Sequence, residues 1–381
     1  MLSGAVCSSR EPGSMPFVRP WSGWPKRGSI WPDHRPNPPS QSMPNPFDVV
    51  LEHLHASRFD DAENACRDIL ARAPNHPGAL CLLGAVANGR GQWAQAHQWI
   101  DQAARLGGEF PVLLVERAVT FQGQGEVGKA IASLRAAVAK EPEVARGHQL
   151  LSELLLPGPD YYQVLSRLHE WLKPRCYLEI GVFRGQSMVL AQAPTIAVGI
   201  DPAAQLHATP QTVTKIFPLE SDVYFGTRDV RSDLEADSVD LAFIDGLHHF
   251  EQTLRDFINV ERLSRPDSVI TIHDGLPLDS LTAARDRKTS FWTGDVWKII
   301  PCLTKWRPDL NVFTVASAPS GLTVVLGADS SSRVLSDNFD AIVAEFMNSD
   351  PEPTKPGWAE SMRMAPNDWD DLRRRLDRRA A

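Results

Sequence analysis

Apolar residues recur at helical spacing in the first half of the chain and gather into short unbroken runs in the second half. From about residue 47 to residue 156, apolar or small side chains fall at i, i+3, i+4 and i+7, for instance at Leu80, Leu83, Gly84 and Ala87, which predicts short paired helices. In the second half, β-prone runs alternate with helical stretches, which predicts a parallel, doubly wound α/β sheet. These runs span residues 176–180, 195–200, 239–245 and 268–274.

The helical half repeats itself every 34 residues. Ala62, Ala96 and Ala130 stand one period apart, and the helix-breaking Pro74 and Pro142 stand two periods apart. The period and the small residues resemble tetratricopeptide repeats, although leucine stands where that family carries a large aromatic residue. The resemblance implies about three stacked helix pairs. Their surface would bind an acceptor, a protein partner or a second subunit, or would only stabilise the neighbouring domain.

The first predicted strand runs into a glycine-containing loop. The loop reads Glu179-Ile-Gly181-Val-Phe-Arg-Gly185, and the next strand ends at Asp201. A dinucleotide-binding loop would read G-x-G-x-x-G, and the absence of this spacing disfavours NAD or FAD. E-x-G-x-x-x-G resembles motif I of the class I S-adenosylmethionine-dependent methyltransferases. The resemblance implies a Rossmann-like fold in which these four residues lie at S-adenosylmethionine, with Asp201 accepting from the ribose hydroxyls.

Two further residues are expected near the same cofactor. Ser187 stands at the start of a predicted short helix, 188–192, and would meet the cofactor carboxylate there. Asp222 is expected near the adenine or at the end of the third strand.

Two later strands end in acids with histidines beside them. Phe243-Ile-Asp245-Gly-Leu-His248-His249 closes one strand, and His273-Asp274 closes the next. This pattern is similar to the macrocin-type sugar O-methyltransferases, and the resemblance covers roughly residues 160–327. It places Asp245 at the cofactor. His248 is the favoured general base, because imidazole titrates near neutral pH, and His249 is the competing choice.

A divalent metal is a second expectation at these strand ends. Asp245 and Asp274 would hold Mg²⁺, and the neighbouring His273 as a third ligand would favour a softer ion such as Mn²⁺ or Fe²⁺. Alternatively, the two acids are metal-free strand-end carboxylates. Gly275 stands where catechol-type relatives carry Asn, which favours this alternative.

Residues 276–296 interrupt the alternation of strands and helices. The segment carries Phe291, Trp292 and Gly294, which suit a lid over the acceptor, or else a packed loop that covers the core. Asp295 either contacts the acceptor or caps the helix that follows it. Residues 311–315 and 321–326 are expected as antiparallel sixth and seventh strands.

Composition limits the classes of function. The 381 residues carry a net charge of -8, which argues against nucleic-acid binding and favours a neutral or polar acceptor. Dispersed cysteines suit a reducing cytoplasm, and apolar runs are too short to span a bilayer. Four domains are predicted. Residues 1–45 form a Pro-rich disordered segment, or else translation starts later, at Met15 or Met43. Residues 46–156 form the repeats, residues 157–328 the methyltransferase domain, and residues 329–381 a helix with a charged, solvated tail.

The sequence therefore predicts a cytoplasmic S-adenosylmethionine-dependent O-methyltransferase fused to tetratricopeptide-like repeats. By resemblance, its acceptor is a hydroxyl on a small molecule, such as a sugar, a glycan precursor or a natural product. A homo-oligomer is compatible with the pattern. The alternative is a repeat scaffold protein whose methyltransferase-like domain is vestigial.

Overall fold

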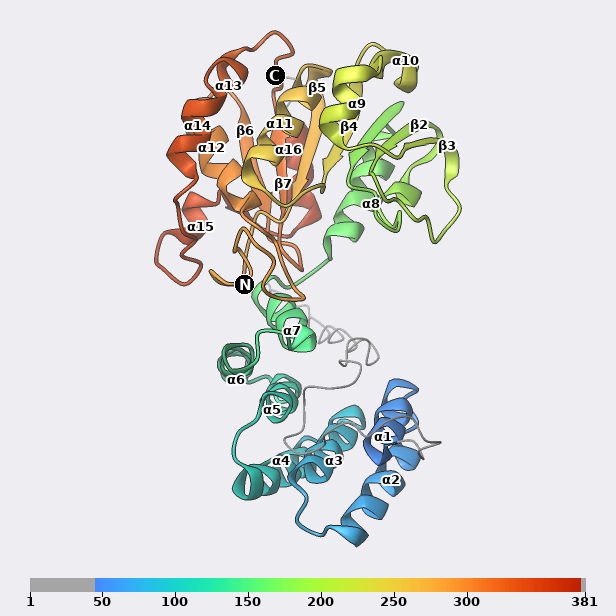
Figure 1. The fold of residues 1–381 in the computed structure, drawn as a ribbon, viewed down its shortest axis with the longest axis vertical. Coiled ribbons are helices and arrows are strands. Elements are labelled where there is room, and N and C mark those ends of the chain that lie inside the picture. Colours follow the sequence, from blue (N-terminus) through green and yellow to red (C-terminus); the bar gives the residue numbers. More distant parts are fainter. Residues whose placement is uncertain (1–44, 378–381) are drawn as a thin grey trace, which may run out of the picture. The chain divides into compact units, whose positions relative to one another are not determined.

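The structure, a computed structural model, describes residues 45–377 (Figure 1). The predicted disorder of residues 1–45 therefore lies outside the described residues, except for residue 45. The chain divides into two compact units, Met1–Gln124 and Gly125–Ala381. Within the described residues, no helix combines the length and the apolar character that a bilayer crossing requires.

The first unit is helical over its described residues. Proline begins three of its helices, at positions where its missing N–H costs no helical hydrogen bond. A Cβ at Gly84 would lie 2.7 Å from Ile100, so the small residue predicted at this crossing lets two helices approach closely. The helices are α1 (Pro46–His55), α2 (Phe59–Arg72), α3 (Pro77–Gly89), α4 (Trp93–Gly107) and α5 (Pro111–Gly123).

The second unit begins with the last helix pair of the predicted repeats. Helices α6 (Val127–Lys140) and α7 (Ala145–Leu155) pack against each other. Helix α8 (Tyr161–Leu172) follows, and its N-terminus is held by a capping box between Asp160 and Gln163. The helical repeat region thus precedes an α/β domain, as predicted.

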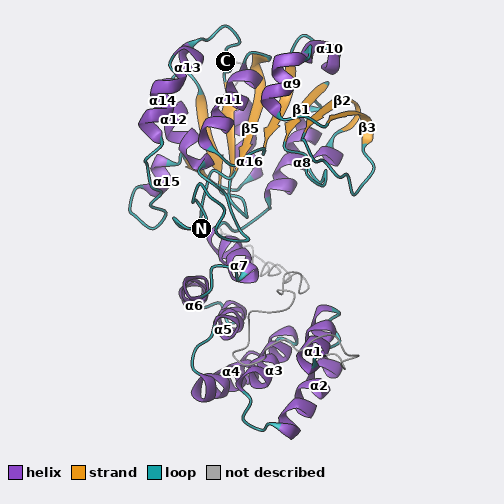
Figure 2. Ribbon diagram, viewed as in Figure 1, coloured by secondary structure: helices purple, strands orange, loops and turns teal. Residues whose placement is uncertain are grey.

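An eight-stranded mixed sheet forms the centre of the second unit (Figure 2). The strand order is β3-β2-β1-β4-β5-β7-β6-β8, and β1 to β5 run parallel to one another. The sequence predicts that both late strands are antiparallel. In the structure β7 runs antiparallel to β5, and β6 runs antiparallel to β7. Strand β6 therefore points in the same direction as β1 to β5, and only β7 is reversed. The strands are β1 (Cys176–Ile180), β2 (Gln192–Ile200), β3 (Gln211–Phe217), β4 (Val239–Ile244), β5 (Ser264–His273), β6 (Asn311–Val315), β7 (Leu322–Leu326) and β8 (Met364–Ala365).

Two apolar cores lie on opposite faces of this sheet. Successive side chains of β1 point to alternate faces, so Leu178 joins one core and Tyr177 the other. Helices α8 and α16 (Trp369–Asp377) cover the second face, and the remaining helices contribute to the first. These are α9 (Ser221–Thr227), α10 (Val230–Leu234), α11 (Phe250–Glu261), α12 (Ile299–Trp306), α13 (Val334–Asp337), α14 (Phe339–Phe346) and α15 (Trp358–Ser361).

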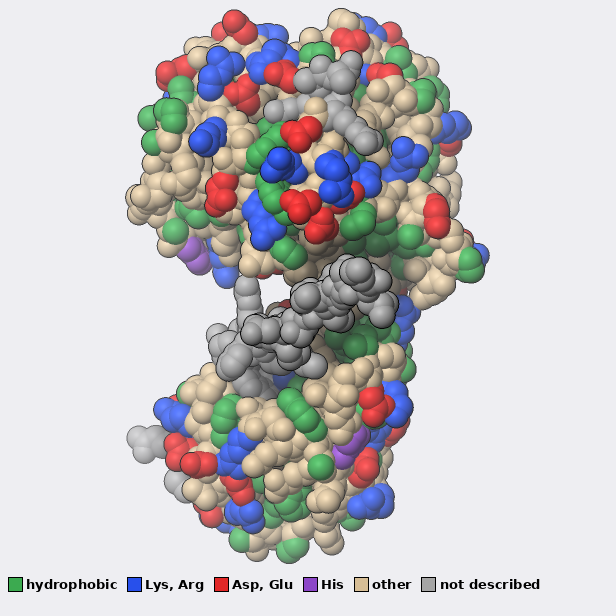
Figure 3. Space-filling view, turned by 180° about the vertical axis from the view of Figure 1, so that it is seen from behind, with side chains coloured by type: hydrophobic (Ala, Val, Ile, Leu, Met, Phe, Trp, Pro, Cys, Tyr) green, Lys and Arg blue, Asp and Glu red, His purple; other side chains and the backbone are tan. Residues whose placement is uncertain are grey.

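Two local predictions were wrong. The helix expected over 188–192 is a single 3-10 turn, η1 (Met188–Leu190), and β2 begins at Gln192. Pro194 explains the early start, since the residue before a proline avoids helical backbone angles. The charged tail is not wholly solvated, because Leu372 and Leu376, four residues apart on α16, are buried and β8 pairs with β6. In Figure 3, acidic and basic side chains are interspersed over the face of the sheet-bearing unit that is in view.

Candidate functional site

A cavity of about 730 Å³ opens at the carboxyl ends of β1, β2, β4 and β5. Parallel strands bring their carboxyl ends to one edge of a sheet, so the strand-end residues meet there. Of the residues that the sequence proposed for the site, the cavity is lined by Gly181, Asp201, Asp222, Asp245, His248, His273 and Asp274. It is not lined by Glu179, Gly185, Ser187 or His249.

The loop after β1 lies close against the end of β4. Gly181 has a φ of +88°, and a Cβ there would lie 1.9 Å from the carbonyl oxygen of Asp245. Only glycine fits this position without moving the backbone. The carboxylate of Asp201 holds the loop, since its Oδ2 accepts from the Phe183 amide at 2.7 Å and its Oδ1 accepts from the Ala203 amide at 2.7 Å.

Glu179 and Ser187 lie beneath this loop and face each other. Glu179 is fully buried and accepts hydrogen bonds from Ser187 Oγ at 2.6 Å and from the Tyr177 hydroxyl at 2.7 Å. Burial raises the pKa of Glu179 to about 8, although both hydrogen bonds act in the opposite direction. These two side chains thus belong to a buried hydrogen-bond network and do not line the cavity. Gly185 packs instead against Leu206, which a Cβ would approach to 2.4 Å.

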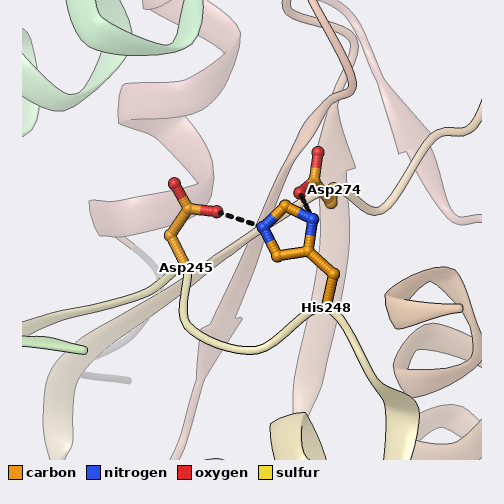
Figure 4. Close-up of side chains that lie close together, drawn as sticks. All are labelled: Asp245, His248 and Asp274. Atoms are coloured by element: carbon orange, nitrogen blue, oxygen red, sulfur yellow. Dashed lines mark ion pairs between the residues drawn. The ribbon is translucent and has the colours of Figure 1, made fainter. Parts of the chain in front are cut away.

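Asp245, His248 and Asp274 line the cavity, and their side chains lie close together (Figure 4). His248 Nδ1 lies 3.1 Å from Asp274 Oδ2 and 3.2 Å from the Trp292 carbonyl oxygen. His248 Nε2 lies 3.7 Å from Asp245 Oδ1, beyond hydrogen-bond distance. Because two acceptors face Nδ1, we assign the hydrogen of the neutral ring to Nδ1, which leaves a lone pair on Nε2.

His273 lies behind this cluster. Its Nδ1 is 3.1 Å from Asp245 Oδ1 and 3.4 Å from Asp274 Oδ1, and its Nε2 is 3.2 Å from Ser320 Oγ. Burial lowers the pKa of His273, but the two carboxylates outweigh burial and raise this pKa to about 10. Both ring nitrogens of His273 thus have polar neighbours in this structure. The three groups close enough to share an ion are Asp245, His248 and Asp274, with ligand atoms within 4.8 Å of one another.

The end of β5 contributes features that the sequence analysis missed. Asp274 is buried and has a φ of 61°, an uncommon backbone conformation for a residue other than glycine. Ser320, from the turn between β6 and β7, donates to Asp274 Oδ1 at 2.6 Å. Tyr161 of α8 packs on the His273 ring with centroids 4.0 Å apart. The positive φ carries no sequence signal at an aspartate, whereas Ser320 stands in a turn-forming Pro-Ser-Gly sequence.

The 276–296 segment contributes part of the cavity wall, through Arg287, Ser290, Phe291, Trp292 and Thr293. Trp292 stacks on His248, with centroids 5.0 Å apart and planes 17° apart. Phe291 also lines the cavity and stacks on His148 of α7, with centroids 5.7 Å apart. The segment therefore lies on the ligand side, as a lid would, rather than only over the core.

Asp295 and His249 are held away from the cavity. Asp295 does not cap the helix after it, because it accepts from the Phe250 amide at 2.7 Å and thereby caps α11. His249 Nδ1 lies 3.4 Å from Arg285 Nη2. Asp222 does line the cavity, where it accepts from Gln252 Nε2 at 3.0 Å.

Comparison with known proteins adds a family match. Residues 178–275 match a family model described as a methyltransferase domain, whereas none of the curated proteins matches the chain. The O-methyltransferase TomG from Streptomyces achromogenes, involved in tomaymycin synthesis and solved with SAM, is 16% identical over 44% of this chain and 80% of its own, with a TM-score of 0.33. An O-methyltransferase from Bacillus cereus, solved with SAH, is 15% identical over 53% of this chain and 90% of its own, with a TM-score of 0.33.

The helical region has its own structural neighbour. The second TPR domain of human RPAP3, solved with an HSP70 peptide, is 14% identical over 29% of this chain and 91% of its own, with a TM-score of 0.25. The family match thus shows that residues 178–275, which follow the helical repeat region, are similar to a methyltransferase domain.

Proposed function

We propose that this chain is an S-adenosylmethionine-dependent O-methyltransferase and that its active site is the cavity at the strand ends. One observation carries the proposal. Gly181, Asp201 and the cluster of Asp245, His248 and Asp274 line one cavity, within the segment that matches the methyltransferase-domain family.

The residues of the cavity fit the cofactor. Each Asp201 oxygen accepts one backbone hydrogen bond, and a carboxylate has about four lone-pair sites, so acceptor capacity remains for two ribose hydroxyls. Gly181 lets the β1 loop approach the backbone at the end of β4, and both Gly181 and Asp222 line the same cavity. When bound, S-adenosylmethionine supplies an electrophilic methyl group on its sulfonium.

His248 is the general base in this proposal. Its Nε2 accepts the proton of the acceptor hydroxyl as that oxygen attacks the methyl carbon. Asp274 and the Trp292 carbonyl hold Nδ1–H and so keep the lone pair on Nε2. Asp245, 3.7 Å from Nε2, stabilises the imidazolium that forms. Trp292 stacks on the ring and limits its rotation.

A metal-assisted reaction is the second candidate, supported by the distances among the same three side chains. Two carboxylate oxygens and one imidazole nitrogen within 4.8 Å suit Mn²⁺ or Fe²⁺ better than Mg²⁺. His248 would then be a ligand and not the base. Activity that survives removal of metal with EDTA supports the base mechanism, whereas activity restored only by added Mn²⁺ or Mg²⁺ supports the metal.

The acceptor and partners are proposed on the pattern of the sequence. The acceptor is a hydroxyl on a small molecule, such as a sugar, a glycan precursor or a natural product, and the repeats bind the acceptor or a protein partner. The protein would act in the cytoplasm. The rival proposal, a repeat scaffold with a vestigial domain, gives no reason for an open cavity lined by ordered carboxylates.

Isothermal titration with S-adenosylhomocysteine tests the proposal. We expect the wild type to bind and Asp201→Ala to bind at least about tenfold more weakly, because each charge-assisted hydrogen bond contributes about 1.5–3 kcal/mol. Absence of binding to the wild type, or equal binding by the two proteins, would refute the proposal.

A further inference from the structure

The 276–296 segment brings one cation to the wall of the cavity. Among the described residues that line the cavity, Arg287 is the only lysine or arginine. The acidic side chains that line the cavity belong to Asp201, Glu220, Asp222, Asp245 and Asp274. His273 also lines the cavity, but its Nδ1 lies 3.1 Å from Asp245 Oδ1 and 3.4 Å from Asp274 Oδ1, so these acids offset any charge on its ring. An anionic group inside the cavity would therefore be attracted at Arg287 and repelled by the carboxylates.

Arg287 is held by its own segment and not by an acid. Its Nε donates to the Thr289 carbonyl at 3.2 Å and its Nη2 donates to the Ser290 carbonyl at 2.9 Å. Its Cζ lies 6.0 Å from the centroid of the Trp292 ring. Within the described part of the chain, no carboxylate forms an ion pair with it. Backbone contacts thus orient the guanidinium and leave its positive charge without a counter-ion.

A neighbouring arginine shows the contrast. Arg285 stands two residues earlier, is paired with Glu251 and lies 3.5 Å from Asp295. Those contacts fasten the segment to α11, and Arg285 does not line the cavity. Lys288, the next residue along the chain from Arg287, is exposed and does not line the cavity either. Among the described lysines and arginines, Arg287 alone combines a charge that no acid pairs with a position on the cavity wall.

The apolar part of the same wall completes the recognition surface. The rings of Phe291 and Trp292 line the cavity next to Arg287. Phe183 and Leu247 line it as well, with 63% and 55% of their surface exposed. Such a wall provides flat apolar surface beside a single cation, which suits a ring-shaped molecule that carries an anionic group.

We propose that Arg287 selects the acceptor, and that the acceptor is a hydroxylated, ring-shaped molecule bearing a carboxylate or a phosphate. This inference rests on the proposed function and names its substrate class. It differs from the neutral or polar acceptor that the net charge of the chain favours, because a net charge does not describe the local field at one wall. The anionic group binds at Arg287, so the hydroxyl is left to face the cluster around His248.

Matched acids and amides test this proposal by isothermal titration in the presence of S-adenosylhomocysteine. The probes are 4-hydroxybenzoate against 4-hydroxybenzamide for an aromatic ring, and glucuronate against glucuronamide for a sugar ring. Phenyl phosphate distinguishes phosphate from carboxylate. We expect the wild type to bind at least one anion at least about tenfold more tightly than its neutral partner or, for phenyl phosphate, than phenol.

The variants separate charge from folding. Arg287→Gln should lose the preference for the anion, Arg287→Lys should keep part of it, and Lys288→Gln should keep all of it. Equal or absent binding of acids and amides by the wild type, or a preference that survives in Arg287→Gln, would overturn the proposal. Weaker S-adenosylhomocysteine binding by Arg287→Gln would also overturn it, because Arg287 would then serve the cofactor carboxylate. Absence of S-adenosylhomocysteine binding to the wild type counts against the proposed function instead, and the acid–amide comparison is then made on the protein alone.

Discussion

Replacing Glu179 by glutamine should remove one component of the pH dependence of stability and leave cofactor binding intact. Glu179 is buried between Ser187 and Tyr177, whose hydroxyls can each donate or accept a hydrogen bond. A glutamine amide can donate to one hydroxyl and accept from the other, so the network keeps its hydrogen bonds. Since Glu179 does not line the cavity, we expect S-adenosylhomocysteine affinity within about threefold of wild type, or about 0.7 kcal/mol.

The size of the effect follows from the pKa of Glu179, which burial raises from 4.5 to about 8. Between these values the folded chain holds a proton that the unfolded chain releases, so this contribution is complete below pH 4.5 and is lost as the pH rises through 8. The limiting loss is about 5 kcal/mol, of which about 4 kcal/mol falls between pH 5 and pH 9. Glutamine stays neutral, so the variant lacks this loss.

Urea unfolding at several values between pH 5 and pH 9 measures the difference. The free energy of unfolding of Glu179→Gln minus that of wild type should increase steadily with pH. Burial also raises the pKa of Asp256, to about 7, but this carboxyl is present in both proteins and its contribution cancels. Glu170→Gln, at an exposed position on α8, is the matched control and should follow the wild-type curve. Parallel curves for wild type and Glu179→Gln would refute the reasoning, as would loss of cofactor binding.

Three other changes probe the site directly. His248→Ala should lower kcat by about 10²–10⁴-fold in a radiolabelled methyl-transfer assay and leave S-adenosylhomocysteine binding unchanged. His249→Ala, at a ring that does not line the cavity, should change kcat by less than about threefold. Equal losses in the two variants would contradict the assignment of His248 as the base. Gly181→Ala should weaken S-adenosylhomocysteine binding by at least about tenfold in titrations, because the new Cβ collides with the Asp245 carbonyl and adds about 1–3 kcal/mol of strain. In the control Gly226→Ala the new Cβ meets open space, and this variant should bind normally. His148→Ala removes the ring stacked on Phe291 and should raise the acceptor KM by about two- to tenfold with an unchanged cofactor KM; a fall in kcat alone would contradict this role.

The buried strands were predictable because their residues are apolar without interruption. β1 and β4 begin and end close to the predicted runs, since a parallel strand covered on both faces needs such a run. The two-residue strand β8 was not predictable, because it is held by backbone pairing with β6 and has no periodicity of its own. The helix predicted before β2 is shorter in the structure, because Pro194 disfavours helical backbone angles at the residue that precedes it.

In the site, chain position was predictable and side-chain direction was not. Gly181, Asp201 and Asp245 meet because parallel strands end at one edge. The sequence could have indicated the burial of Glu179, because residues two apart on a strand share a face and Tyr177 belongs to an apolar core. Both His248 and His273 lie beside the two acids, and which of them could share an ion with Asp245 and Asp274 depends on rotamers that the sequence does not specify.

The stacking of His148 on Phe291 has a consequence for the history of this architecture. The last helix pair of the repeats supplies a side chain to the back of the acceptor wall, so a recombination event that joined the two halves at residue 157 would have left that wall unsupported. We therefore expect helices α6 and α7 to be inherited together with the α/β domain that follows them. Relatives of this chain should accordingly retain an aromatic pair at positions 148 and 291.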